Sequence, residues 1–352
     1  MKLMIVGGFL GAGKTTLLWE AARRLAAEGT TVGLITNDQV PDLVDTAILS
    51  RSGAVVREIA GSCFCCDFNG FKEAVDSLVD SGADIIMAEP VGSCTDLSAT
   101  VLQPLKALMP EHTILPFSVL VDPARIDDTL RETRPVLHAD AVYILHLQLE
   151  EADRIVLNKT DILSPGEVAD VRHFLNEEFP GTPVTIISAL TGEGVSEWLV
   201  QALAGGAAGT RIIPVDYDRY AHGEAVLGWL NAVVELQRTG DHACGWESYA
   251  TQFLEAFRRR LAAVSSEIGH LKLLIDCPSG RVAANLTQLK DKGSCRVEGV
   301  IESVGAVLTV NARVQADPSA VEGIVREVIA EISGEEIVAA FRTVHCIQPG
   351  RP

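Results

Sequence analysis

Short runs of β-branched and aliphatic residues alternate with amphipathic segments of helical period over roughly the first 200 residues. Such alternation predicts parallel strands joined by helices that wrap the sheet. The predicted strands cover residues 3–6, 32–36, 85–88, 114–121, 155–157 and 184–187. We therefore expect an α/β domain with a mostly parallel sheet.

The pattern changes after a cluster of glycine and alanine at 204–209, which Pro214 follows. This composition is typical of a linker, so we expect one domain over 1–207 and a second over 208–352. The second segment predicts an apolar strand at 225–236, strands at 271–276, 282–286 and 307–314, a helix over 321–332 and a last strand at 337–344. An earlier helix is predicted from apolar residues spaced by three and four: Tyr249, Phe253, Phe257, Leu261, Val264 and Ile268. This order predicts a small α+β domain of ferredoxin-like type, suited to docking a client or partner.

Composition narrows the class of protein. The chain has 352 residues, a formal charge of -18, 47% apolar residues and only 5% aromatic residues. That length favours two domains. The negative charge would repel a phosphate backbone and few aromatic rings are present to stack on bases, so we expect no nucleic-acid partner. No secretion signal or bilayer-length apolar run is evident, so we expect a cytoplasmic protein with no membrane partner.

Residues 8–15, with the sequence GFLGAGKT, match the phosphate-binding loop of P-loop NTPases. They lie between a predicted strand and a predicted helix, as that motif requires. Lys14 is expected to reach the β- and γ-phosphates and to support catalysis, and Thr15 to place its hydroxyl on Mg²⁺. A glycine-rich turn that binds nothing is the weaker alternative. The nucleotide-binding residues predicted here are Gly8, Gly11, Ala12, Gly13, Lys14, Thr15 and Thr16.

A second loop predicts which base is bound. The strand at 155–157 opens into Asn158, Lys159, Thr160 and Asp161. The Asp161 carboxylate can accept hydrogen bonds from the N1–H and amino group of guanine, while Asn158 would bond the base and Lys159 would cover the ring. The alternative is a helix cap followed by a polar turn. A later strand leads into three residues expected to brace the base: Ser188, Ala189 and Leu190. GTP and GDP are therefore the expected nucleotides.

Two acidic residues at strand ends are the candidates for nucleotide-responsive switches. Glu89 ends the strand 85–88 and is expected to hold Mg²⁺ or orient the attacking water, and Gly92 to follow the γ-phosphate. Asp38 closes the second strand and is a candidate for a second Mg²⁺ contact; its alternative role is to cap a turn.

Three cysteines, Cys63, Cys65 and Cys66, crowd into four positions between these switches. In an extended segment Cys63 and Cys65 would face the same side, and a turn would bring in Cys66. Three thiolates suit Zn²⁺, Co²⁺ or Cu⁺; the alternative is that they are buried small hydrophobic residues. Further candidates are a fourth ligand, Cys94, and a second site from His242 with Cys244 or His345 with Cys346.

The combination of residues 8–15, the Cys63 to Cys66 motif, Glu89 with Gly92, and residues 158–161 resembles the CobW/HypB/UreG family of P-loop GTPases, and within it the CobW-like branch. The resemblance covers residues 1 to about 205. It implies GTP-dependent delivery of Zn²⁺, Co²⁺ or a metal-containing cofactor such as a corrinoid to a client metalloprotein or corrinoid protein. It also implies a nucleotide-dependent homodimer.

Two other functions remain open at this point. A P-loop kinase or ATP-driven ligase would use the thiols structurally. A metal store or sensor would use GTP only to set its conformation.

Overall fold

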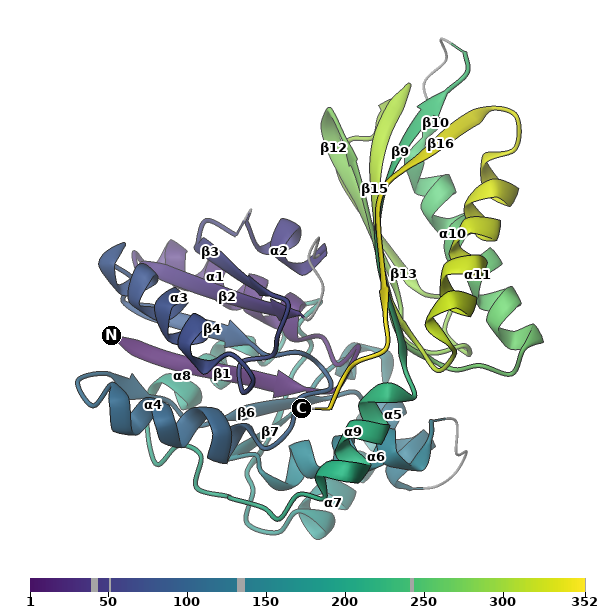
Figure 1. Cartoon of the computed structure of the whole chain (residues 1–352). Coiled ribbons are helices and arrows are strands. Elements are labelled where there is room, and N and C mark those ends of the chain that lie inside the picture. Colours follow the sequence, from purple (N-terminus) through teal and green to yellow (C-terminus); the bar gives the residue numbers. More distant parts are fainter. Residues whose placement is uncertain (39–43, 51, 132–136, 241–243, 352) are drawn as a thin grey trace. The chain divides into compact units, whose positions relative to one another are not determined.

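The computed structural model describes residues 1–38, 44–50, 52–131, 137–240 and 244–351. The chain divides into two compact units. The first unit contains Asp45–Gly223 together with the N-terminal strands and helix, and the second is built from Glu224–Arg351 (Figure 1). Each unit has its own hydrophobic core.

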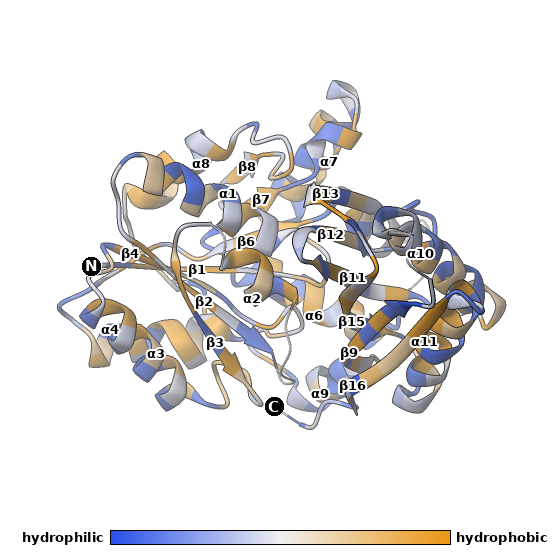
Figure 2. Ribbon diagram, turned by 90° about the horizontal axis from the view of Figure 1, so that it is seen from above, coloured by the Kyte–Doolittle hydropathy of each residue, from blue (hydrophilic) through white to orange (hydrophobic). Residues whose placement is uncertain are grey.

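The first unit is a parallel sheet with helices packed on it, in the strand order β3-β2-β4-β1-β6-β7-β8, with β5 also paired to β1. Every pairing among these described strands is parallel, which confirms the predicted α/β class. The strands are β1 (Lys2–Gly8), β2 (Val32–Asp38), β3 (Val55–Ala60), β4 (Ile85–Glu89), β5 (Thr113–Ile114), β6 (Ser118–Val121), β7 (Arg154–Leu157) and β8 (Val184–Ile186). The central strands β1 and β4 are buried and appear hydrophobic in Figure 2.

Helix α1 begins directly after the phosphate loop and buries an apolar face that includes Leu17, Leu18 and Leu25 against the sheet. The helical segments of the first unit are α1 (Lys14–Ala27), α2 (Val44–Leu49), α3 (Phe68–Asp80), η1 (Ser98–Leu102), α4 (Gln103–Leu108), α5 (Pro123–Arg125), η2 (Ile126–Leu130), α6 (Ala139–Glu150), η3 (Thr160–Ile162), α7 (Pro165–Glu178), α8 (Val195–Leu203) and α9 (Tyr217–Ala225). No helix in the described part of the chain is both long and apolar enough to cross a membrane.

The first unit differs from the sequence prediction in two places. Strand β3 was not predicted, because only Ile59 among its residues is buried and charged side chains interrupt the apolar run, as is common at a sheet edge. The predicted strand 114–121 is instead two strands, β5 and β6. Pro116 lies between them and has no N–H to donate to a ladder, which explains the break.

The second unit is an antiparallel sheet in the order β13-β12-β11-β15-β9-β16. Helices α10 (Trp246–Ala263) and α11 (Pro318–Ser333) contribute to the same core as the sheet (Figure 1). The four strands β11-β15-β9-β16, with α10 after β9 and α11 after β15, have the expected ferredoxin-like order, and β12 and β13 extend the sheet. The strands are β9 (Gly228–Arg238), β11 (Ile268–Cys277), β12 (Ser279–Leu286), β13 (Ser294–Val300), β15 (Gly305–Val314) and β16 (Ile337–Ile347), with a separate ribbon of β10 (Cys244–Gly245) and β14 (Glu302–Ser303).

Helix α10 ends earlier than predicted. It stops at Ala263, and Ser265 takes a left-handed conformation with φ 54°. Val264, which was expected on the apolar face, is exposed, and Ile268 begins β11 instead of ending the helix. The apolar spacing that predicted the helix continued by coincidence into the next strand, because both elements contribute apolar residues to one core.

The division between the units falls between Gly223 and Glu224, further along the chain than the boundary predicted near 207. Helix α9 explains the difference. The Tyr220 hydroxyl accepts a hydrogen bond from the Thr95 N–H at 3.3 Å, and Tyr217 donates to Asp96 Oδ2 at 2.5 Å. These bonds hold the segment after the glycine-rich linker on the first unit.

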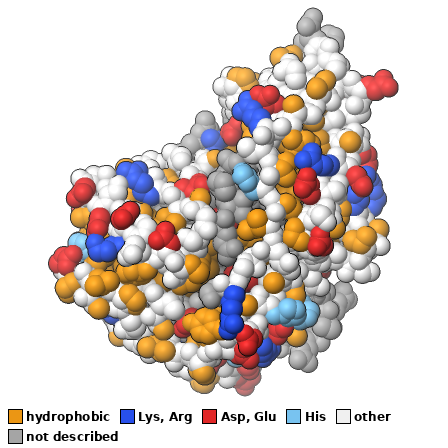
Figure 3. Space-filling view, in the orientation of Figure 1, with side chains coloured by type: hydrophobic (Ala, Val, Ile, Leu, Met, Phe, Trp, Pro, Cys, Tyr) orange, Lys and Arg blue, Asp and Glu red, His pale blue; other side chains and the backbone are white. Residues whose placement is uncertain are grey.

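Charged side chains of both signs are interspersed on the face shown in Figure 3. Among the described residues, ion pairs form within one helix, as between Lys72 and Asp76, or between two helices, as between Arg260 and Glu331. Such pairs leave the net charge of -18 unchanged, and exposed pairs of this kind add little stability.

Candidate nucleotide and metal site

The phosphate loop lies at the carboxyl end of β1 and leads into α1. Gly11 and Gly13 adopt positive φ angles of 78° and 97°. A side chain at position 13 would lie 2.3 Å from the Asn158 amide nitrogen, so only glycine fits there. The Lys14 ammonium donates to the carbonyl oxygens of Gly8 at 2.8 Å and Phe9 at 3.4 Å. The lysine side chain therefore lies across the loop. The loop leads into the first turn of α1, whose free backbone N–H groups can bind an anion.

Oxygen atoms converge next to this loop. The Thr15 hydroxyl oxygen lies 2.6 Å from Asp45 Oδ1 and 3.0 and 3.1 Å from the two carboxylate oxygens of Glu89. Lys14 Nζ lies 3.9 Å from Glu89 Oε1. One hydroxyl and two carboxylates form the hard oxygen donor set that Mg²⁺ prefers. The donor set fits the predicted Mg²⁺ and the predicted roles of Thr15 and Glu89.

Asp45 was not predicted from the sequence. It is the second residue of α2, and neither apolar periodicity nor a motif marks it. The predicted candidate Asp38 ends β2, is buried, and accepts a hydrogen bond from the Gly61 N–H through its carbonyl. A contact of Asp38 with Mg²⁺ stays a prediction, as does the contribution of Thr16, which lies half-buried in α1.

The segment after β4 passes close to the phosphate loop. A side chain added to Gly92 would lie 2.7 Å from Leu10 Cδ2 and 3.1 Å from Lys14 Nζ. The backbone can approach the lysine only because this residue is glycine. This placement fits the prediction that Gly92 responds to the γ-phosphate.

The base-specificity loop is joined to the phosphate loop by Asn158. Its amide donates to the Ala12 carbonyl at 2.8 Å, and its side-chain oxygen accepts from the Ala189 N–H at 2.9 Å. Ser188 donates to Asp161 Oδ1 at 2.6 Å. The residues predicted to bind and brace the base therefore meet in one place at the ends of β7 and β8.

Lys159 and Leu190 add two details to this loop. Lys159 has a left-handed backbone with φ 59°, and its ammonium binds Asp122 Oδ2 at 2.6 Å. Asp122 was not predicted; it caps α5 by accepting from the Ala124 N–H, which is the sequence signal that could have found it. Leu190 is exposed, so only its backbone is placed to brace a base.

The three-cysteine motif forms a compact thiol cluster. Cys63 Sγ lies 2.8 Å from the sulfur atoms of both Cys65 and Cys66, and those two are 4.0 Å apart. The segment is a turn and not an extended strand, because the Cys63 carbonyl accepts hydrogen bonds from the N–H groups of Cys66 and Asp67. The expected convergence of three thiols is present, although it arises from this turn. The separations exceed the roughly 2.05 Å of a disulfide, and all three are free thiols.

The thiol cluster favours one ionised sulfur. Hydrogen bonds from the thiols of Cys65 and Cys94 lower the pKa of Cys63 far below its usual range. Its contact with Cys63 raises the pKa of Cys65, and contacts with Cys63 and Cys65 raise the pKa of the buried Cys94. A thiolate is the form that binds a soft metal, so the cluster is prepared for one.

Of the two candidate pairs for a second thiol site, the structure describes only the pair in β16. His345 and Cys346 are consecutive in β16 and therefore point to opposite faces of the sheet. Cys346 donates to the Pro318 carbonyl, and burial raises its pKa to about 11. His242 and the side chain of Cys244 lie outside the described residues.

Comparison with known proteins agrees with this geometry. The sequence pattern of the nucleotide-binding domain of the CobW/HypB/UreG family matches residues 2–182, just over half of the chain. The chain belongs to the CobW/HypB/UreG family. The phosphate loop, the switch glutamate, the thiol motif and the start of the base loop all lie within the matched residues.

Two bacterial relatives in this family are named zinc chaperones. CobW of Pseudomonas aeruginosa is 26% identical over 218 residues, covering 55% of this chain and 57% of the relative. YeiR of Escherichia coli is 32% identical over 172 residues, covering 46% and 47%. The chain spans about half the length of these relatives.

The chain is also similar, at low identity, to two solved structures. HypB from Archaeoglobus fulgidus is 19% identical over 58% of this chain and 89% of that chain, with a TM-score of 0.42. A Zn(II)-bound triple mutant of the YjiA GTPase is 17% identical over 94% of this chain and 98% of that chain, with a TM-score of 0.37.

A buried carboxyl group braces the segment after β4 in this family member. Glu151 is fully buried and accepts hydrogen bonds from the Thr95 hydroxyl at 3.0 Å and the Ser98 N–H at 2.9 Å. Burial raises the pKa of Glu151 to about 8. The neighbouring Asp96 has a left-handed backbone with φ 61°, and its hydrogen bond raises the pKa of Tyr217 to about 12. Burial therefore favours the protonated form of a carboxyl that is hydrogen-bonded to this segment.

A second potential metal group, not predicted from the sequence, consists of His138, Asp140 and His222. The Asp140 carboxylate already binds His222 Nδ1 at 2.6 Å and Arg219 Nε at 3.0 Å. Its contact with His222 lowers the pKa of Asp140. The group acts as an ion-pair network that ties α9 to α6.

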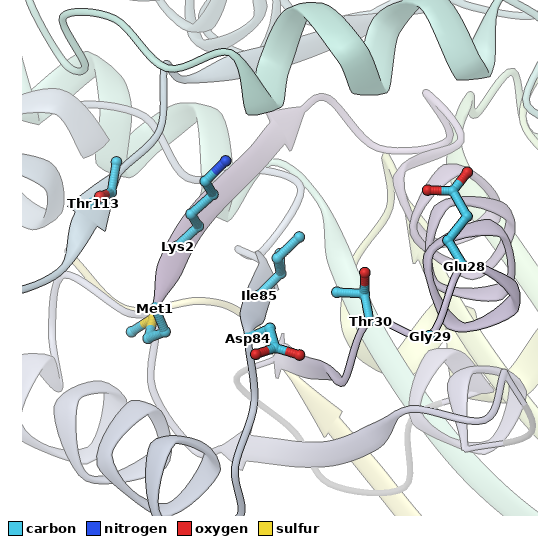
Figure 4. Close-up of a pocket in the computed structure, with 8 residues that line it drawn as sticks. All are labelled: Met1, Lys2, Glu28, Gly29, Thr30, Asp84, Ile85 and Thr113. Carbon is cyan, nitrogen blue, oxygen red and sulfur yellow. The ribbon is translucent and has the colours of Figure 1, made fainter.

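One open cavity of about 430 Å³ lies at the other end of the parallel sheet. Its lining includes Lys2, Ile85 and Thr113, each at or next to the amino end of a strand (Figure 4). Ligands of open parallel sheets bind at the carboxyl ends of the strands, where the phosphate loop lies. This cavity is therefore not the nucleotide site.

Proposed function

We propose that the protein is a GTP-hydrolysing metallochaperone. It holds a soft metal ion, or a cofactor that contains one, at the cluster of Cys63, Cys65 and Cys66. GTP binding and hydrolysis at the phosphate loop control when that cargo passes to a client protein.

The main support for this proposal is that the thiol turn is hydrogen-bonded to the carboxyl end of β2, in the same sheet that carries the phosphate loop. Asn37, at the end of β2, donates to the Ser62 carbonyl at 2.6 Å and accepts from the Phe64 N–H at 3.1 Å. The neighbouring residue Asp38 accepts from the Gly61 N–H. A movement at the carboxyl end of β2 is therefore transmitted to the thiol turn through direct hydrogen bonds.

Guanine selectivity rests on Asp161, Asn158 and Lys159. Asp161 Oδ1 accepts a hydrogen bond from the Ser188 hydroxyl, which restrains the carboxylate and supports its proposed role. A fixed charged acceptor recognises the two adjacent donors of guanine and rejects adenine, which lacks them.

Zinc is the cargo that we favour, because three thiolates suit it and the curated relatives are named zinc chaperones. Co²⁺ meets the same donor set, and a cobalt-containing corrinoid is an alternative cargo. The second unit is proposed to dock the client metalloprotein or corrinoid protein, and GTP to promote a homodimer. The cytoplasmic location stays a prediction.

Release of metal during turnover tests this function. The reduced protein is loaded with one equivalent of Zn²⁺ and mixed with a chelating dye in the presence of GTP, GDP or a non-hydrolysable GTP analogue. We expect fast transfer with GTP and slow transfer with the analogue, because release follows hydrolysis.

The Lys14→Ala variant serves as the hydrolysis control and should transfer slowly with GTP. Equal transfer rates under all conditions would show a metal store that does not use GTP, and would overturn the proposal. Equal binding of ATP and GTP would favour a P-loop kinase or ligase instead.

A further inference from the structure

Two imidazole rings and one carboxylate meet where the start of α6 lies beside α9 (Figure 1). His138 caps α6, Asp140 is in the first turn of that helix, and His222 belongs to α9, 82 positions after Asp140. The ligand atoms of the three side chains, one from each residue, all lie within 4.8 Å of one another. Folding of the first unit therefore gathers three potential metal ligands from two helices.

The spacing of these atoms is close to that of a metal site. Nitrogen and oxygen ligands that lie about 2.1 Å from a tetrahedral ion are roughly 3.4 Å from one another. Asp140 Oδ2 lies 2.6 Å from His222 Nδ1 and 3.8 Å from His138 Nδ1, and the centroids of the two rings are 4.8 Å apart. An ion that enters would separate the first pair and draw the second pair together by less than about 1 Å, a change within reach of side-chain rotation.

The carboxylate has a partner that uses its other oxygen. Arg219 Nε donates to Asp140 Oδ1 at 3.0 Å, and the guanidinium lies over the Tyr143 ring, 4.1 Å from its centroid. A partner of this kind fixes the direction of a ligating carboxylate. The Asp140 side chain is 18% exposed, whereas the side chains of His138 and His222 are 41% and 56% exposed. An ion can therefore reach the three ligands from solvent.

We propose that His138, Asp140 and His222 form a second metal site, which binds a divalent ion of the Co²⁺ to Zn²⁺ series and leaves a fourth position for water. Imidazole and carboxylate groups suit these ions, whereas a softer ion such as Cu⁺ prefers thiolates. The ion would replace the bond between His222 and Asp140, and the 3.2 Å bond from the Asp140 N–H to His138 Nδ1. It would join α9, which leads directly into β9, to α6. This inference depends neither on the thiol cluster nor on GTP.

Binding at this site should be weaker than at the thiol cluster. The Arg219 guanidinium and the positive end of the α6 dipole both lie next to the ligands, and like charges repel. Two neutral imidazoles and one carboxylate also carry less negative charge than three thiolates. A chelator that competes with the thiol cluster should therefore remove the ion from this second site first.

The competing explanation is that the three side chains form only an ion-pair network between the two helices. In that case the loss of the histidines would loosen α9 and leave the number of bound ions unchanged. Metal ligation predicts a change in that number.

The test is a Co²⁺ titration of the reduced, metal-free protein. Equilibrium dialysis counts the bound ions, and the thiolate-to-cobalt charge-transfer band reports the thiol cluster. In the wild type we expect two ions, of which the second adds no thiolate band. The double variant His138→Gln with His222→Gln should keep the band and bind the second ion at least about tenfold more weakly.

His173→Gln is the matched control. It removes an exposed histidine that pairs with a single carboxylate, that of Glu177, so this variant should bind both ions as the wild type does. A second ion that the double variant still binds with unchanged affinity would overturn the proposal, and so would a wild type that binds only the ion at the thiols.

X-ray absorption on the wild type with one and then two equivalents of Zn²⁺ needs no variant, so it decides the question even if the double variant does not fold. The second equivalent should add scattering from imidazole, and a second equivalent without it would exclude the site. The proposed function can fail separately. A wild type with the histidine-dependent ion and no thiolate band would contradict metal loading at the thiol cluster and still support this second site.

Discussion

Replacing the buried Glu151 by glutamine should change how stability depends on pH. The ordinary pKa of this carboxyl is 4.5, and burial raises it to about 8 in the folded chain. The folded state therefore holds the proton more tightly than the unfolded state. The resulting stability is fully present below pH 4.5 and is lost as the pH rises to about 8.

The magnitude follows from this difference. Each pKa unit corresponds to about 1.4 kcal/mol, so the full effect is on the order of 5 kcal/mol. Between pH 6 and pH 8.5, roughly half of it, about 2–3 kcal/mol, should be lost. Glutamine keeps one carbonyl oxygen to accept from the Ser98 N–H and can donate from its amide to the Thr95 hydroxyl oxygen, as a protonated carboxyl can, and it does not ionise.

Denaturant unfolding at several pH values, followed by a probe in the first unit, measures this effect. Relative to the wild type, Glu151→Gln should gain about 2–3 kcal/mol of stability between pH 6 and pH 8.5, since all other titrating groups are common to both proteins. The control is Glu150→Gln, which removes the neighbouring, partly exposed carboxylate of α6. Parallel pH profiles for wild type and Glu151→Gln would refute the reasoning.

Three further predictions concern the nucleotide site. Asp161→Asn should weaken GTP binding by about 1.5–3 kcal/mol in calorimetric titration and favour xanthine nucleotides, whereas Asp170→Asn on the exposed surface of α7 should not. Lys14→Ala should lower the GTP hydrolysis rate roughly 100- to 1,000-fold in a phosphate-release assay, because charge on the phosphates is no longer neutralised; a rate equal to wild type would rule out this active site. Asp45→Asn should raise the Mg²⁺ concentration needed for hydrolysis by roughly tenfold, and an unchanged Mg²⁺ dependence would exclude Asp45 from the metal's surroundings.

The parallel sheet was predictable from the sequence because its strands are buried on both faces and read as continuous apolar runs. The phosphate loop was predictable because its glycines and lysine occur at fixed spacing next to a strand. Strand β3 escaped prediction since it lies at the edge, where burial does not select apolar residues. The end of α10 was misplaced because the backbone reversal at Ser265 has no strong residue signature.

The sequence did not predict those parts of the site that depend on contacts between residues far apart in the chain. Asp45 approaches Thr15 from a separate helix, and Gln148 reaches the segment after β4 from α6. No local residue spacing predicts these contacts, because they depend on how the helices pack around the sheet. The thiol motif itself was readable, since three cysteines in four residues are rare, but its turn conformation was not.

The central claim is that nucleotide and metal affinities are coupled, and a competition titration tests it most directly. Zn²⁺ affinity is measured with GDP and with a non-hydrolysable GTP analogue, on the wild type and on a variant in which Cys63, Cys65 and Cys66 are all serine. We predict tighter binding with the GTP analogue, by a factor on the order of 5–150, and little binding by the triple variant. Identical affinities in the two nucleotide states, or undiminished binding by the triple variant, would contradict the account.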